Sequence, residues 1–150
     1  MVKVRRGVIM GVDVEILEFE GGTETVEKAS QQSGEPISRI VKTLLLKAGD
    51  EYVVVIARGD RRVNLDALGR FLDKPVAMAR AREVRQVLGV DVGAVTPLSE
   101  AVRRLRVIMD PSILENEYVL CGGGAKNVLI KVRVKDLVSL LNPEMLDAFI

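Results

Sequence analysis

The chain has 150 residues, with 22 Lys and Arg against 21 Asp and Glu, a formal net charge of +1 and no histidine. This length is typical of one domain, so we expect a single domain over residues 1–150, and the balanced charge excludes the uniform positive field of a chromatin protein or polybasic membrane binder. The lack of histidine, together with a single cysteine, rules out a His-based catalytic triad and a His/Cys zinc site.

The N-terminal stretch MVKVRRGVIMG is charged and lacks the apolar core of a signal peptide. The single cysteine, Cys121, cannot form an intramolecular disulfide, and no run of about 18 apolar residues offers a membrane span. We therefore expect a cytoplasmic protein with no membrane partner.

The next stretch predicts a strand followed by a helix. Val12 to Phe19 reads VDVEILEF and alternates apolar with acidic residues, which is the period of a half-exposed strand. The following EGGTET supplies a turn and threonines suited to a helix N-cap. We therefore expect a helix from about Thr25 to Ser33 that ends at Gly34 and Pro36.

Residues 37–59 predict two buried strands with a turn between them. The second, Tyr52 to Ala57, is apolar on both faces, as expected for a central strand that is covered on both sides. Asn64 is a suitable N-cap for the helix that follows. One side of that helix carries Leu65, Leu68, Phe71 and Leu72.

A short strand from Val76 to Met78 leads to a second amphipathic helix in RAREVRQVLG, which ends at Gly89. On this helix Arg82 and Arg85 are expected to face solvent together. The predicted buried stripe comprises Ala81, Val84, Val87 and Leu88.

The last third predicts three short strands and then two short helices. The strands are Leu105 to Met109, Tyr118 to Cys121 and Val128 to Val134, and the helices are separated at Asn142-Pro143. Because strands alternate with helices early and then follow one another, we expect an α/β or α+β domain with a mixed, strongly twisted central sheet flanked by short helices.

Lys42 is the anomalous residue of the first buried strand. Alternation places it on one face with Ile40, Leu44 and Leu46, so neither face of the strand is polar. One interpretation is an edge-strand lysine whose stem packs on leucines while its ammonium reaches water. The other is a cation in a pocket wall that holds a carbonyl, carboxylate or phosphate oxygen; burial would lower its pKa, so a polar or negative partner would have to lie nearby.

Two glycine-containing loops are further candidates. GAVTP, which includes Gly93, Ala94 and Pro97, is either a plain connector or a stiffened turn that lets backbone N–H groups approach a ligand. CGGGA, with Gly122, Gly123 and Gly124, is either a turn or bulge or a bare backbone edge against a substrate. It matches neither nucleotide-binding glycine motif.

Other polar features have simpler interpretations. Asp110-Pro111-Ser112 indicates a turn or cap, and Cys121 is expected to be a small buried apolar residue. The arginines at 61–62, 80, 82, 85 and 103–104 could contact phosphates or could form a solvated surface. Aromatic residues make up only 3% of the chain and offer few platforms for base stacking.

The order of these segments resembles the YbaK/ProX family of aminoacyl-tRNA deacylases, which is related to the inserted editing domain of bacterial prolyl-tRNA synthetases. The similarity spans most of residues 12–141, and its most specific part is the IVKTLL strand followed by a GxxxP loop about fifty residues later. The matching segments are EILEFEGGTETVEKASQQSG, RIVKTLLLK, VVVIARGDRRVNLDALGRFL, AREVRQVLGVDVGAVTP and VIMDPSILENEYVLCGGG.

The resemblance implies a trans-editing hydrolase that cleaves a wrong amino acid from the 3′ adenosine of tRNA. In the family the lysine at position 42 is essential and the glycine at position 93 helps to define the aminoacyl pocket. The family uses no metal, cofactor or covalent enzyme intermediate, and a tRNA ribose hydroxyl helps to activate water. Gly93 to Pro97 and Gly122 to Gly124 would then shape the amino-acid pocket, and Arg80, Arg82 and Arg85 would contact the acceptor stem.

The expected substrate is tRNA(Pro) that carries alanine or cysteine, with an aminoacyl-tRNA synthetase as a further partner and no DNA partner. Two departures from the family pattern are Ser99, where the loop often has a glycine, and GGGAKN, where some members have a histidine. Two alternatives stay open from the residues alone. One is a binding module that recognises an aminoacyl or tRNA end without cleaving it, and the other is an interaction protein that docks on a synthetase through its sheet edge.

Overall fold

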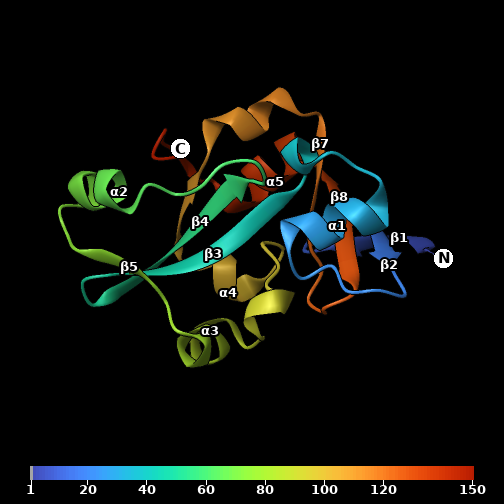
Figure 1. Cartoon of the computed structure of the whole chain (residues 1–150), viewed down its shortest axis with the longest axis horizontal. Coiled ribbons are helices and arrows are strands. Elements are labelled where there is room, and N and C mark those ends of the chain that lie inside the picture. The colour runs from blue at the N-terminus through green and yellow to red at the C-terminus, as the bar shows by residue number, and fades with distance from the viewer. Residues whose placement is uncertain (1) are drawn as a thin grey trace.

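The computed structural model describes residues 2–150 as an α+β fold with two β-sheets and short helices (Figure 1). The helices are α1 (Val26–Ser33), α2 (Leu65–Leu72), α3 (Ala81–Leu88), α4 (Glu100–Arg103) and α5 (Val134–Leu141). The strands are β1 (Lys3–Ile9), β2 (Val12–Glu18), β3 (Val41–Ala48), β4 (Glu51–Arg58), β5 (Val76–Met78), β6 (Arg106–Met109), β7 (Tyr118–Gly122), β8 (Val128–Arg133) and β9 (Glu144–Met145). No helix within residues 2–150 is long and apolar enough to cross a membrane.

The five-stranded sheet is the mixed sheet that the sequence predicts. Its order is β5-β3-β4-β6-β9, in which β3 pairs antiparallel with β4 and β5 while β4, β6 and β9 run parallel. Strand β4 is central, and its residues 53–57 are fully buried, as expected for a strand covered on both sides. Leu68 of α2 packs on one face, and Leu88 of α3 and Leu137 of α5 belong to the core on the other.

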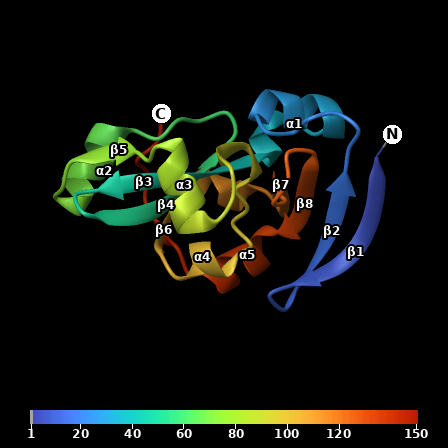
Figure 2. The same cartoon turned by 90° about the horizontal axis from the view of Figure 1, so that it is seen from below.

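The four-stranded antiparallel sheet has the order β1-β2-β8-β7, and its outermost hairpin lies at one end of the molecule (Figure 2). Strand β2 confirms the prediction made from its alternating residues, but β1 was not predicted. The sequence of β1, KVRRGVI, has three cations and a glycine, and most of its residues are exposed. All seven residues of β1 pair with β2, and this pairing defines the strand. Its own sequence has no apolar alternation that would predict a strand.

Capping residues fix the helix ends close to the predicted places. The Thr25 side chain accepts a hydrogen bond from the Lys28 N–H (3.1 Å), and the Asn64 side chain accepts one from the Ala67 N–H (3.1 Å). Gly34 and Gly89 end α1 and α3 in the left-handed conformation, each with φ of 75°.

Three local predictions need correction. The second C-terminal helix is absent, because the chain beyond Asn142 instead adds β9 in parallel to β6. On α2 and α3, Phe71 and Ala81 are exposed at the ends of stripes whose centres are buried. Each helix packs on the sheet along one side only, and Phe71 near the end of α2 and Ala81 at the start of α3 lie outside that contact.

A buried carboxylate ties the C-terminal segment to the five-stranded sheet. Asp110 has no exposed surface, and its Oδ1 accepts hydrogen bonds from the Ser112 N–H (2.9 Å) and Oγ (2.7 Å) and from the Arg61 guanidinium (2.9 Å). Arg61 also donates to Asp147 (2.9 Å) and to the Phe149 carbonyl (2.8 Å). Asp110 therefore serves as the predicted cap, and in addition it pairs with a cation that holds the chain terminus.

Candidate functional site

The two sheets part beside the first half of β3, and this leaves part of a strand edge uncovered. Ile40 still bridges to Leu120 in parallel, and β5 covers the edge only from Leu46 onward. The Leu45 carbonyl accepts from the Ala79 N–H at 3.0 Å, so the odd-numbered residues of β3 direct their backbone groups to this edge. The N–H and C=O of Thr43 therefore face the uncovered edge, where no strand of the described chain pairs with them.

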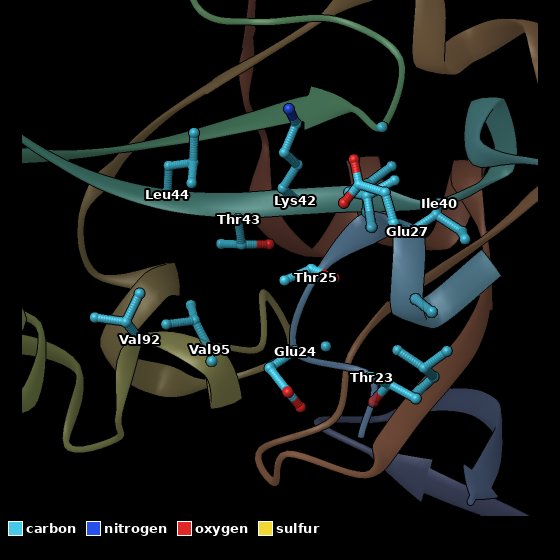
Figure 3. A pocket seen from close by; sticks show the side chains of 17 residues that line it. Thr23, Glu24, Thr25, Glu27, Ile40, Lys42, Thr43, Leu44, Val92 and Val95 are labelled. Atoms are coloured by element: carbon cyan, nitrogen blue, oxygen red, sulfur yellow. The ribbon is translucent and has the colours of Figure 1, made fainter. Parts of the chain in front are cut away.

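A cavity of about 300 Å³ occupies this uncovered edge. Its walls are β3, the start of α1, the turn at residues 92–95 and the end of β7 (Figure 3). Lys42, Gly93 and Gly122, which lie far apart in the sequence, all line it. The structure therefore brings together one residue from each of the three segments that the sequence singles out.

Lys42 projects from β3 on the side that also carries the Glu27 carboxylate, whereas Thr43 points to the other side, toward Val95 (Figure 3). Within residues 2–150 the Lys42 ammonium makes no hydrogen bond or close ion pair. Burial lowers its pKa from 10.5, the negative charges of Glu27 and Asp60 oppose that shift, and the positive charge of Arg62 adds to it. Lys42 is thus a partly desolvated cation without a direct ion pair within residues 2–150, and Glu27 supplies a negative charge nearby.

Thr43 supplies the one buried side-chain polar atom that has no hydrogen-bond partner within residues 2–150. Buried hydroxyl groups are normally satisfied, because leaving one unpaired costs about 1 to 3 kcal/mol. Because Thr43 lines the cavity, a bound molecule that reaches this hydroxyl would supply the missing partner.

The start of α1 gives the cavity a polar wall opposite β3. Thr23, Glu24, Thr25 and Glu27 all line it. Glu24 is paired with Lys28 at 2.5 Å, and Thr25 is occupied as the helix cap, so Glu27 is the carboxylate here that makes no pair with another described residue. The sequence-based interpretation assigned the GGTET threonines to capping alone and missed their place in this wall.

The glycines at the cavity are required for close packing. A Cβ on Gly122 would stand 2.0 Å from the Val95 carbonyl oxygen, and one on Gly93 would stand 2.8 Å from the Glu24 Cβ. Gly122 therefore lets the turn at residues 92–95 approach the sheet, and Gly93 lets the same turn approach the start of α1.

We expect Gly122→Ala to push this turn off β7, because the Val95 carbonyl is backbone and has little freedom to shift. The variant should lose about 1 to 3 kcal/mol of unfolding free energy in urea titrations and should bind a cavity ligand more weakly. Gly124→Ala is the control. Gly124 has a φ of 90° but open space around it, so only backbone strain of about 1 kcal/mol applies. Equal losses in both variants would contradict the proposed contact.

Several other predicted residues do not line this cavity. Ala94 and Pro97 are buried, and Gly123 packs against Val128. Gly124 lies with Ala94 and Arg85 around a separate, shallow groove. They support or neighbour the cavity and do not form its wall.

Of the three predicted acceptor-stem arginines, Arg85 faces the shallow groove and forms an ion pair with Asp91 at 3.7 Å. Arg80 and Arg82 are exposed, and neither lines the cavity or that groove. Ser99, the departure in the loop, has a local role because its Oγ accepts a hydrogen bond from the Val102 N–H at 3.3 Å and caps α4.

Cys121 is fully buried, and burial raises the pKa of its thiol to about 12. It therefore behaves as the small apolar residue that the sequence predicts and is not placed to act as a nucleophile. Among residues 2–150 there is no group of three His, Cys, Asp or Glu side chains arranged to hold a metal ion.

Comparison with known proteins places this cavity in a family context. Residues 20–140 match the model of the aminoacyl-tRNA editing domain. The chain is 33% identical over 104 residues to the proline--tRNA ligase of Thermosipho melanesiensis, which covers 69% of this chain and 18% of the ligase. The chain thus spans about a fifth of the length of such ligases.

Two crystal structures share the fold over most of the chain. The hypothetical protein APE2540 matches with a TM-score of 0.82 and 30% identity, covering 91% of both chains. A protein described as a candidate trans-editing enzyme for prolyl tRNA synthetase matches with a TM-score of 0.82 and 25% identity, covering 89% of this chain and 85% of its own. Together with the family match over residues 20–140, these similarities show that the chain belongs to the aminoacyl-tRNA editing domain family, as its resemblance to YbaK/ProX proteins implies.

Proposed function

We propose that this protein is a trans-editing hydrolase that deacylates mischarged tRNA, with tRNA(Pro) carrying alanine or cysteine as its substrate. The observation that carries the proposal is the cavity at the uncovered edge of β3, where the Lys42 ammonium and the Thr43 hydroxyl have no hydrogen-bond partner among residues 2–150. Membership in the editing-domain family and the similarity to proline--tRNA ligases support the class of substrate.

The two sides of β3 suggest how the substrate lies. On the Thr43 side the cavity is lined by Val92, Gly93 and Val95, which suit a small amino-acid side chain (Figure 3). On the other side Lys42 offers a cation for an oxygen of the terminal nucleotide. A hydrophobic pocket separates amino acids that differ by one methylene by only about 1 to 3 kcal/mol, so a second hydrolytic site that admits small side chains is a useful complement to a synthetase.

The chemistry needs no histidine. Water attacks the ester carbonyl, the tetrahedral intermediate collapses, and the ribose oxygen leaves and takes up a proton to restore the tRNA hydroxyl. The protein contributes orientation and fixed dipoles, which can supply a large share of the barrier reduction. We assign to Lys42 the binding of a phosphate or carbonyl oxygen and to the Thr43 hydroxyl a hydrogen bond to the aminoacyl group.

Glu27 should set the pH range in which Lys42 is charged. Burial lowers the Lys42 pKa and the Glu27 carboxylate partly restores it, so activity that needs the ammonium is present below this pKa and falls as pH rises through it. Removing the carboxylate lowers the pKa further. In Glu27→Gln we therefore expect the alkaline decline of the deacylation rate, corrected for spontaneous ester loss, to begin at lower pH than in the wild type.

Asp66→Asn is the matched control, because Asp66 also lies in the first turn of an eight-residue helix but is remote from the cavity. Its pH profile should overlay that of the wild type. An unchanged profile in Glu27→Gln would show that this carboxylate does not act on Lys42.

The direct test is to incubate the protein with Ala-tRNA(Pro), Cys-tRNA(Pro) and Pro-tRNA(Pro) and to follow the loss of each ester. We expect hydrolysis of the alanyl or cysteinyl ester and retention of the prolyl ester. Tight binding of these tRNAs without ester loss would instead identify a recognition module, and binding to a synthetase that persists without tRNA would identify a docking protein.

A further inference from the structure

The adjacent residues Arg61 and Arg62 have different environments. The Arg61 guanidinium is engaged with Asp110, Asp147 and the Phe149 carbonyl. The side chain of Arg62 is exposed and makes no hydrogen bond or ion pair with any of residues 2–150. Its backbone, however, is held on both sides, because its N–H donates to the Ile150 carbonyl (2.9 Å) and its C=O accepts from the Ile150 N–H (2.8 Å). Arg62 is thus an unengaged cation on a fixed piece of backbone.

Arg62 lies near the Lys42 end of the cavity. Gly59, directly after β4, lines the cavity, and the turn closed by the Arg61 N–H bond to the Arg58 carbonyl (2.9 Å) leads from it to Arg62, whose charge is close enough to lower the pKa of Lys42. Lys42 and Arg62 are therefore two neighbouring cations, and no carboxylate among residues 2–150 forms an ion pair with either of them. Such an arrangement costs electrostatic free energy that an anion between or beside the two cations would recover.

The acidic groups nearby do not neutralise both cations. Asp60 is engaged by the Arg58 guanidinium through two hydrogen bonds of 2.6 and 3.1 Å. That leaves Glu27 as the unengaged carboxylate that acts on Lys42. Lys42 and Arg62 are therefore cations without an ion pair within residues 2–150, and a phosphate can pair with Arg62 without displacing an existing ion pair.

We propose that Arg62 binds the phosphodiester that links the terminal adenosine of the tRNA to the preceding nucleotide. This inference rests on the proposed function, because it takes the aminoacylated adenosine to occupy the cavity. A guanidinium at the mouth can hold two phosphate oxygens at once, which positions the strand without reading its sequence. Arg62 then fixes how deeply the terminal nucleotide enters, and the ester is held over Thr43.

The test measures binding of two short RNA hairpins that have the same single-stranded 3′ end and terminate in an uncharged adenosine. In one, the last phosphodiester is intact; in the other, a neutral methylphosphonate replaces it. We expect the wild type to bind the neutral version about 10-fold more weakly. In Arg62→Ala most of this difference should disappear, and the salt dependence of binding to the intact hairpin should fall by about 0.7 in log–log slope.

Arg70→Ala is the matched control, because Arg70 is also exposed and unengaged but lies on α2, away from α1 and the cavity (Figure 1). It should keep the full difference between the two hairpins. If Arg62→Ala keeps the wild-type difference, or if Arg70→Ala loses it equally, the inference is overturned. Because binding needs no ester cleavage, an Arg62-dependent difference in a protein without deacylase activity would contradict the proposed hydrolysis and would still support the contact between Arg62 and the phosphate.

Discussion

Replacing Lys42 by alanine should lower the deacylation rate by about 100-fold or more while leaving the fold intact. The expected loss is that of one preorganised charged donor acting in a site with little water. Because Lys42 makes no hydrogen bond or ion pair within residues 2–150, its removal breaks no polar contact of the fold. The rate of ester loss under single-turnover conditions, together with a urea unfolding curve, measures both quantities.

The control is Lys47→Ala, because Lys47 lies on the same strand, is exposed and forms an ion pair with Glu83 at 3.8 Å. Removing such a surface pair should change stability by less than about 1 kcal/mol and should leave deacylation unchanged. A Lys42→Ala protein that retained the wild-type rate would remove Lys42 from the mechanism and would favour the edge-strand interpretation of this residue.

Replacing Asp110 by alanine should destabilise the protein by about 3 kcal/mol, which corresponds to a fall of about 6 to 12 °C in Tm. The variant removes a fully buried carboxylate, and it deprives Ser112 and the largely buried Arg61 guanidinium of their acceptor. Thermal unfolding followed by circular dichroism measures the change.

Asp147→Ala separates this effect from a general loss of charge. Asp147 contacts the same guanidinium at 2.9 Å, but its side chain is 70% exposed, so we expect a cost below about 1 kcal/mol. If the two variants were equally stable, the buried position of Asp110 would have no special importance for the C-terminal anchor.

Elements with a strong local pattern could be predicted from the sequence. The alternation in β2, the two-sided apolar run of β4 and the caps Thr25 and Asn64 each carry their own signal, and the structure confirms them. Strand β1 is defined by its pairing with the neighbouring β2, and β9 by its pairing with the distant β6, so their own residues do not identify them.

The candidate site likewise has features that the local sequence predicts and features that depend on the fold. Periodicity alone marks Lys42 as anomalous, and the glycine loops stand out by composition. The cavity itself exists because β3 and β7 diverge after the Ile40–Leu120 bridge, between segments about eighty residues apart. No local pattern encodes that divergence, which is why Thr43 and Glu27 were not among the predicted site residues.

The measurement that tests the central claim most directly is deacylation of Ala-tRNA(Pro) or Cys-tRNA(Pro) with substrate in large excess over the protein. The proposed trans-editing activity predicts many esters cleaved per protein molecule, at a rate that falls to near the spontaneous rate in Lys42→Ala. Ester loss that never exceeds the spontaneous rate with the wild-type protein, for both substrates, would contradict it.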